Sequence, residues 1–179
     1  MFDKDRDLIS RCLQKDRAAE KQLYHRFAPI MFGVCLRYGG NEMEAEDILQ
    51  NGFIRLFSHL HQFRFKCDLE NWVHPIFVTT AINYYRQQLK FNQQLELDEN
   101  MEDTIFLNED AISLMSKKEL LAVIHRLPVG YRTVFNMYII EGYDHKEIAS
   151  LLRISEGTSK SQLHRAKISV RRMLKEIEN

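Results

Sequence analysis

Residues 143–167 carry the pattern of two helices joined by a tight turn, which is the arrangement of a helix-turn-helix. Asp144 lies three residues before Glu147, and this is the spacing of a capping box that opens a helix. The turn falls at Arg153, and Ser155 is a favourable N-cap for the helix that follows. The pattern therefore predicts two helices that pack on each other at the C-terminal end of the chain.

The second of these helices is basic on its outer face. The side chains expected there are Lys160, Ser161, His164 and Arg165. Side chains of these types pair with phosphates and with the acceptor edge of guanine. The stretch 153–175 also holds seven basic residues against one acidic residue. The pattern indicates duplex DNA as the partner, and an ordinary helical hairpin with a solvated basic face is the alternative.

The rest of the chain is also expected to be helical, because it contains only seven glycines and three prolines and its apolar residues recur at helical spacing. Helices are predicted near residues 5–15, 17–37, 42–60, 71–90, 112–126, 129–140, 144–152 and 156–176. The fold class is therefore all-α, with two small helical domains joined by an acidic linker. The second is a four-helix domain that contains the helix-turn-helix.

Net charge points to no class of partner, because Lys plus Arg and Asp plus Glu each number 25. The distribution of charge is informative. Residues 91–112 carry seven acidic and no basic side chains, and their apolar residues are scattered. We expect this stretch to be a linker between a domain at 1–90 and a domain at 113–179.

The three cysteines are isolated in the sequence, and none has a neighbour at zinc-ligand spacing. Reduced and mostly buried thiols are therefore expected, and no metal site or cofactor. No apolar run is long enough to span a bilayer, and the charged start of the chain is unlike a signal peptide. These features predict a cytoplasmic chain.

Residues 42–60 form an amphipathic pattern with Glu46, Asp47 and Gln50 towards the polar side. Clustered carboxylates suit acid–base chemistry or a metal ion, but acids in a first helical turn also favour the positive end of the helix dipole. No histidine or further acid completes a catalytic set. A protein-binding face is the preferred interpretation.

Aromatic and basic residues lie close together at 63–66 and again at 84–90, with Trp72 between these two places. Aromatic faces stack on unpaired bases while cations hold the phosphates, so this stretch has the ingredients of single-strand binding. Most of these aromatic residues, Trp72 in particular, are expected to pack in the core.

Three segments together resemble one known family. Residues 45–57 are similar to the core-polymerase-binding helix of the extracytoplasmic-function (ECF) sigma factors of bacterial RNA polymerase, which belong to the sigma-70 family. Residues 72–86 resemble the helix with which that family reads and melts the −10 promoter element, and residues 127–149 resemble the start of its −35-binding domain. The likeness covers about residues 18–90 and 113–175.

The resemblance implies a role for each matching position. Contact with core RNA polymerase falls to Glu46, Asp47, Gln50 and Phe53. The melted −10 element is contacted by Phe63, Arg64, His74, Ile76, Thr79, Tyr84, Arg86 and Lys90, with Phe63 as a wall of a base pocket. The −35 major groove receives Thr158, Lys160, Ser161, Gln162, His164 and Arg165. The expected partners are core polymerase, promoter DNA and an anti-sigma factor, and the chain is expected not to be an enzyme.

The sequence departs from the family pattern at four positions. Thr79 stands where asparagine is common, so base preference at −10 is expected to differ. Pro75 implies a helix start near Trp72 or a kink, and Gly52 costs its helix about 1 kcal/mol relative to alanine. Arg153 stands where glycine is common, so it is expected to carry left-handed backbone strain.

Two other functions compete with this interpretation. An autonomous DNA-binding regulator would use residues 113–175 alone and bind duplex DNA tightly without polymerase, usually as a dimer. It would have no need of the segment at 45–57. A small helical enzyme would need a nucleophile with its base, a phosphate loop or metal-ligand spacing, and the sequence offers none of these.

Overall fold

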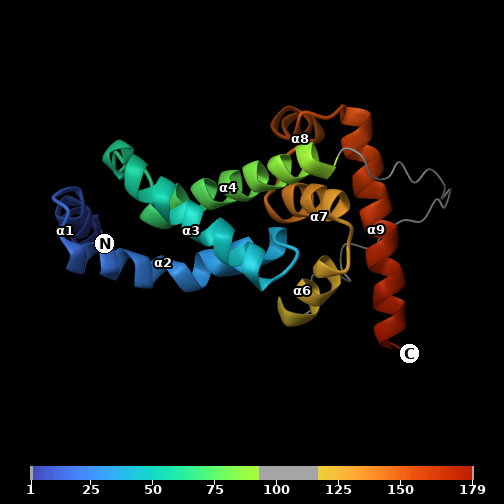
Figure 1. Ribbon diagram of the computed structural model, residues 1–179, viewed down its shortest axis with the longest axis horizontal. Coiled ribbons are helices and arrows are strands. Elements are labelled where there is room, and N and C mark those ends of the chain that lie inside the picture. The colour runs from blue at the N-terminus through green and yellow to red at the C-terminus, as the bar shows by residue number, and fades with distance from the viewer. Residues whose placement is uncertain (1, 93–116, 179) are drawn as a thin grey trace. The chain divides into compact units, whose positions relative to one another are not determined.

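The structure is a computed structural model that describes residues 2–92 and 117–178 (Figure 1). Every element in the described part of the chain is a helix, which confirms the all-α class. The chain divides into two compact units, residues 1–83 and 84–179, and the boundary lies inside a helix. Apart from its first two residues, the predicted linker at 91–112 lies outside the described residues.

The helices follow one another in the order that the sequence predicts. The first unit contains α1 (Phe2–Leu13), α2 (Arg17–Tyr38), α3 (Glu42–His59), the short 3-10 helix η1 (Leu60–Gln62) and most of α4 (Leu69–Asn92). The second unit contains α6 (Lys117–His125), α7 (Val129–Phe135), the π-helix η2 (Asn136–Ile140), α8 (His145–Leu152) and α9 (Glu156–Glu178). Helix α4 begins three residues before Trp72, so Pro75 lies inside it. No helix in the described ranges is long and apolar enough to cross a membrane.

Local caps explain where the helices of the first unit begin. The Asp16 carboxylate accepts hydrogen bonds from the backbone N–H groups of Ala18 and Ala19 at the start of α2. Asn41 is the N-cap of α3, and its side-chain oxygen accepts a hydrogen bond of 2.9 Å from Glu44 N. Glycine is needed at position 39, between α2 and α3, because a Cβ there would lie 2.9 Å from Ala45 N, which is too close for a normal contact.

Helices α3 and α4 approach each other at Gly52. The sequence alone marks this glycine only as a cost to the helix. In the structure a Cβ at position 52 would overlap Cδ1 and Cε1 of Phe77, a fully buried side chain on α4. The glycine therefore lets the two helices pack at short distance around the ring.

The helix-turn-helix of the second unit is formed by α8 and α9. The capping box between Asp144 and Glu147 is present at the start of α8, and the Ser155 hydroxyl accepts from Thr158 N at 2.9 Å at the start of α9. Arg153 ends α8 in the left-handed region, with φ 59° and ψ 44°. The predicted caps and the predicted backbone strain are confirmed, and apolar side chains such as Leu152 and Leu163 are buried.

Candidate nucleic-acid and protein interfaces

The outer face of α9 carries a row of exposed polar and basic side chains. Lys160, Ser161 and His164 are exposed, and Thr158 is half-buried one turn nearer the helix start. Lys160 Nζ lies 3.8 Å from Glu156 Oε2, and both side chains are more than half exposed. Ion pairs of this exposed kind contribute little to stability, so Lys160 is accessible to an anionic partner.

Two of the six residues assigned to this face lie against α7. Arg165 is half-buried, and its Nη1 donates a hydrogen bond of 3.2 Å to the Tyr131 hydroxyl. A Cβ on Gly130 would lie 3.3 Å from Gln162 Nε2, which places that amide beside the start of α7. The Oε1 atom of Gln162 is buried and has no hydrogen-bond partner among the described residues. The beginning of α7 therefore borders the candidate DNA-reading face, which sequence spacing does not reveal.

His145, the first residue of α8, is a feature that sequence reasoning missed. Its Nδ1 lies 2.9 Å from the hydroxyl oxygen of the buried Ser159, and its ring stacks on Tyr138 with centroids 4.7 Å apart. Burial lowers the pKa of His145, and the nearby Lys160 and Lys167 lower it further against the opposite effects of Glu156 and Asp144. The neutral imidazole thus joins the two helices of the helix-turn-helix. The only available signal was its place directly after the capping residue.

Acidification is expected to destabilise the second unit through His145. Its pKa is lowered in the folded state, so the unfolded chain binds more protons than the folded chain once the pH falls below about 6.5. The stability contributed by neutral His145 is present above that pH and is lost as the pH falls through the lowered pKa. Urea unfolding of the full chain at pH 7.5 and 5.5, followed by NMR signals of α9, measures the loss. His145→Gln should reduce this pH dependence, and an undiminished dependence would contradict the assignment.

Three aromatic rings, two in the loop after η1 and one on α4, form a cluster. Phe63 is only 6% exposed, and its ring centroid lies 4.7 Å from that of Phe65 and 5.3 Å from that of Trp72. Phe65 has a left-handed φ of 56°, and the Arg6 guanidinium of α1 lies 5.2 Å from its ring centroid. Phe63 therefore supports the loop from within, and the half-buried Phe65 is the ring nearer the surface. The contact with Arg6 has no signal in the sequence.

Beside this cluster α3 and α4 border a groove of about 380 Å³. Its lining residues are Arg55, His59, Gln62, Cys67, Asn71, Trp72, Pro75, Ile76 and Thr79. Two predicted −10 residues, Ile76 and Thr79, thus share one groove with the indole of Trp72. The groove combines apolar walls with amide, hydroxyl and guanidinium groups.

The remaining predicted −10 residues lie outside that lining. Arg64 is exposed in the loop and His74 is half-buried on α4. Tyr84 and Arg86 are half-buried further along α4, and the side chain of Lys90 lies outside the described residues. The structure therefore gathers part of the predicted set at the groove and distributes the rest between the loop after η1 and α4.

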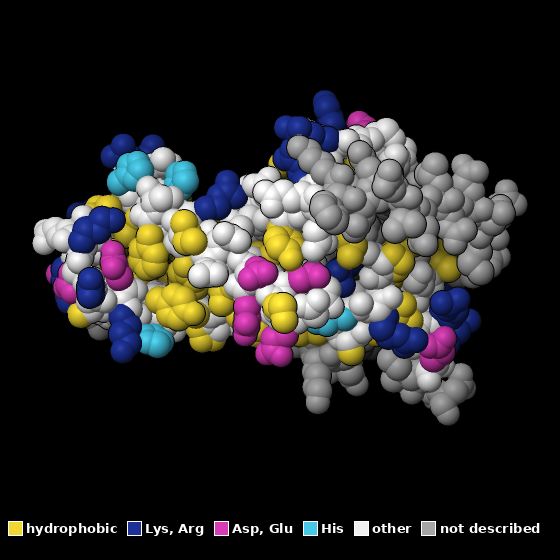
Figure 2. Space-filling view, viewed as in Figure 1, with side chains coloured by type: hydrophobic (Ala, Val, Ile, Leu, Met, Phe, Trp, Pro, Cys, Tyr) yellow, Lys and Arg dark blue, Asp and Glu magenta, His cyan; other side chains and the backbone are white. Residues whose placement is uncertain are grey.

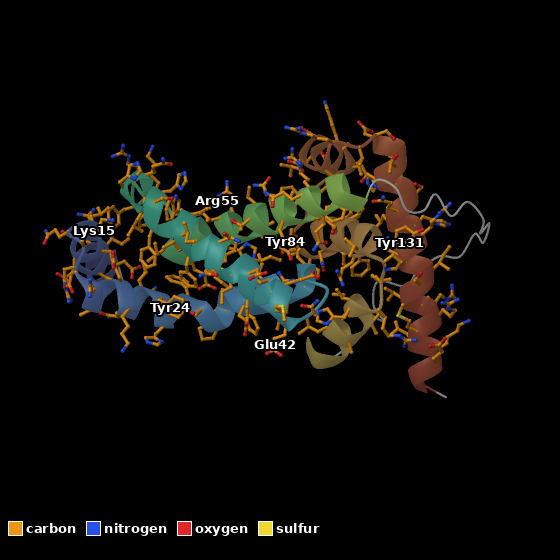
Figure 3. All side chains as sticks on the ribbon, in the orientation of Figure 1. Lys15, Tyr24, Glu42, Arg55, Tyr84 and Tyr131 are labelled. Carbon is orange, nitrogen blue, oxygen red and sulfur yellow. The ribbon has the colours of Figure 1, made fainter. Side chains whose placement is uncertain are left out.

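A second and larger groove, of about 790 Å³, lies between α2 and α3. Its lining residues are Tyr24, Ala28, Pro29, Phe32, Glu46, Leu49, Gln50, Phe53, Ile54 and Phe57. Figure 2 shows apolar side chains gathered over these two helices, with acidic side chains nearby at the start of α3. Tyr24 is labelled on α2 in Figure 3. An apolar groove with an acidic border is suited to a protein partner.

The predicted protein-binding residues divide into two kinds at this groove. Glu46, Asp47 and Gln50 are exposed, whereas Phe53 is 4% exposed and its ring contacts those of Tyr24 and Phe77. Ile54 also lines the groove and is 61% exposed, although none of the predicted sites includes it. The available signal was an apolar residue at a position that does not belong to the buried face of α3.

Comparison with known proteins gives matches at both units. Residues 23–91 match the family described as sigma-70 region 2, and residues 117–170 match sigma-70 region 4. The chain is 24% identical to the RNA polymerase sigma-H factor of Pseudomonas aeruginosa, a match that covers 96% of this chain and 94% of that protein. It is 26% identical to the ECF RNA polymerase sigma factor SigW of Bacillus subtilis, with 94% and 96% covered.

A solved structure has a similar fold. It is the complex of the sigma factor RpoE with the anti-sigma factor NepR from Bartonella quintana, matched with a TM-score of 0.50 at 17% identity. The match covers 87% of this chain and 96% of the matched chain. At that level of identity the likeness concerns the fold.

Proposed function

This chain belongs to the ECF sigma factors of the sigma-70 family, and we propose that it directs core RNA polymerase to promoters through three separate surfaces. The groove between α2 and α3 binds the polymerase, the groove between α3 and α4 receives an unpaired −10 base, and α9 reads the −35 element. The observation that carries the proposal is that these surfaces coexist in one chain. A regulator that binds DNA alone has no use for the α2–α3 groove.

The polymerase-binding role rests on the apolar groove and its border. Tyr24 and Ile54 expose large apolar surfaces there, and Glu46 and Asp47 supply exposed carboxylates alongside. Apolar side chains at the centre of an interface provide most of its binding energy, while charges at its rim set orientation and association rate. The arrangement thus suits a partner with an apolar ridge and basic neighbours.

The −10 role rests on the chemistry of the smaller groove. Taking a base out of the duplex costs a few kcal/mol, and stacking on an aromatic side chain returns roughly 1–3 kcal/mol per base. The indole of Trp72 offers such a face, and the amide of Asn71 and the hydroxyl of Thr79 offer hydrogen bonds to base edges. Exposed cations in the adjoining loop, Arg64 and Lys66, suit the phosphates of the melted strand.

The −35 role rests on α9. Lys160, Ser161 and His164 present donors on one exposed face, and the Ser155 cap fixes the helix start near Thr158. A helix presented in this way enters the major groove with its first turns. Arg165, one turn beyond Ser161, has the donor geometry for a guanine edge.

The chain contributes binding energy and no bond-breaking step in this proposal. The polymerase performs nucleotidyl transfer, and no cofactor is needed for promoter selection. The site of action is the cytoplasm, where the polymerase and the chromosome meet. An anti-sigma factor is a further partner, a proposal supported by the fold shared with a sigma factor solved in complex with one.

The test is transcription of a fragmented genomic library by core polymerase, with and without the full-length chain, followed by mapping of the RNA 5′ ends. New start sites that share two upstream elements at fixed spacing are expected. Silence, with active core and a working control sigma factor, would contradict the proposal. Tight duplex binding by the chain alone in that case would favour the autonomous regulator.

A further inference from the structure

Tyr131, which belongs to none of the predicted sites, is hydrogen-bonded to the candidate DNA-reading helix. Tyr131, labelled in Figure 3, lies on α7. Its hydroxyl oxygen accepts a hydrogen bond of 3.2 Å from Arg165 Nη1 on α9. Both side chains are half-buried, so the contact is partly shielded from water. The two residues are 34 positions apart in the sequence, and only the packing of α7 on α9 brings them together.

We propose that Tyr131 is a positioning residue that orients the guanidinium of Arg165 for reading a base of the −35 element. The proposal rests on the proposed function, because it assigns Tyr131 a role through the DNA contact of Arg165. Tyr131 itself does not touch the base.

The turn of α7 that carries Tyr131 is held in place by burial and by hydrogen bonds. Its neighbours on α7, Arg132 to Phe135, are all buried. The start of α7 is fixed by hydrogen bonds from Arg132 N to Pro128 O and from the Thr133 hydroxyl to Val129 O, each at 2.9 Å. A hydroxyl carried by such a helix turn is a fixed point next to α9.

The geometry of guanine recognition explains why orientation matters. A bidentate pair requires two donors of one guanidinium in the plane of the base edge, and a long arginine side chain has many other rotamers. An arginine carries five donors, and the hydrogen bond from Nη1 of Arg165 to the phenol restricts the plane of the guanidinium. Tyr131 thus lowers the entropy that Arg165 loses when DNA binds.

The experiment compares the full-length wild-type chain with Tyr131→Phe, each bound to core polymerase, on promoters that carry every base at every −35 position. We expect Tyr131→Phe to lose roughly three- to tenfold in affinity for the preferred base at one position, because one side chain is no longer preorganised. Preference at the other positions should remain. Tyr143→Phe, which removes a hydroxyl elsewhere in the same unit, is the matched control and should match the wild type.

A second comparison tests whether the effect passes through Arg165. In an Arg165→Ala background, Tyr131→Phe should change the base preference no further. Equal weakening on all promoters, a lowered melting temperature with unchanged preference, or no effect at all would each overturn the positioning role. If the wild-type chain with core polymerase yields no promoter-specific starts, the proposed function has failed. If the wild type is selective and Tyr131→Phe behaves like it, only the positioning role has failed.

Discussion

Gly52→Val is expected to destabilise the first unit by about 3 kcal/mol, at the upper end of the usual cost of overpacking a core. A side chain at this position would overlap the ring of Phe77, which is fully buried and has no room to retreat. Valine is a slightly better helix former than glycine, but that gain is only a few tenths of a kcal/mol. The steric cost therefore prevails.

The chain offers both a probe and a matched control for this experiment. Its single tryptophan, Trp72, lies in the first unit, so fluorescence during urea unfolding reports on that unit. Gly33→Val places the same side chain in the middle of α2, where a Cβ would meet nothing within 4 Å. It should be neutral or slightly stabilising. Equal unfolding free energies for the two variants would show that α3 and α4 can separate at no cost.

Ile54→Glu is expected to abolish most core-polymerase binding while leaving the free chain stable. The side chain is 61% exposed on the wall of the α2–α3 groove, so a carboxylate there remains hydrated in the free protein. In the complex this carboxylate would be buried without a hydrogen-bond or ion-pair partner. A loss of about 2–4 kcal/mol, roughly 30- to 700-fold in dissociation constant, is expected for disrupting a central apolar contact.

Titration of fluorescently labelled full-length chain with core polymerase measures this loss. Leu13→Glu provides the control, because Leu13 is 47% exposed on α1 and does not line the groove. Urea unfolding of both variants should match the wild type within about 0.5 kcal/mol, as for ordinary surface substitutions. Wild-type affinity in Ile54→Glu would place the polymerase contact elsewhere on the chain.

Local features of the fold could be read from the sequence because their causes lie within a few residues. The capping box at Asp144, the cap at Ser155 and the left-handed Arg153 depend on hydrogen bonds or sterics inside one turn. Helical spacing likewise predicted an amphipathic helix at 42–60, and in the structure Glu46, Asp47 and Gln50 are exposed while Ile48 and Leu56 are buried. Periodicity identifies the buried face of each helix separately.

Contacts between helices could not be predicted in the same way. Periodicity does not specify which inward face meets which neighbour. The close packing of Gly52 against Phe77 and the hydrogen bond of Arg165 to Tyr131 therefore have no local signature. The same limit applies to Phe63, chosen as a pocket wall by resemblance and found 6% exposed. The sequence therefore predicted which surfaces form the candidate site. It did not predict the contacts between helices that hold those surfaces in place.

The close approach of α3 and α4 also has a mechanical consequence. Helix α3 carries Glu46 and Ile54 on the face assigned to the polymerase, and its opposite face meets α4 at Phe77, two residues before Thr79. Protein interiors are close-packed and barely compressible, so they transmit displacement. At Gly52 the two helices are already in close contact, so a shift of α3 towards α4 would push directly on the ring of Phe77. Under the proposed function, docking of the polymerase on α3 is therefore expected to displace α4, and with it Thr79 in the groove that the two helices share.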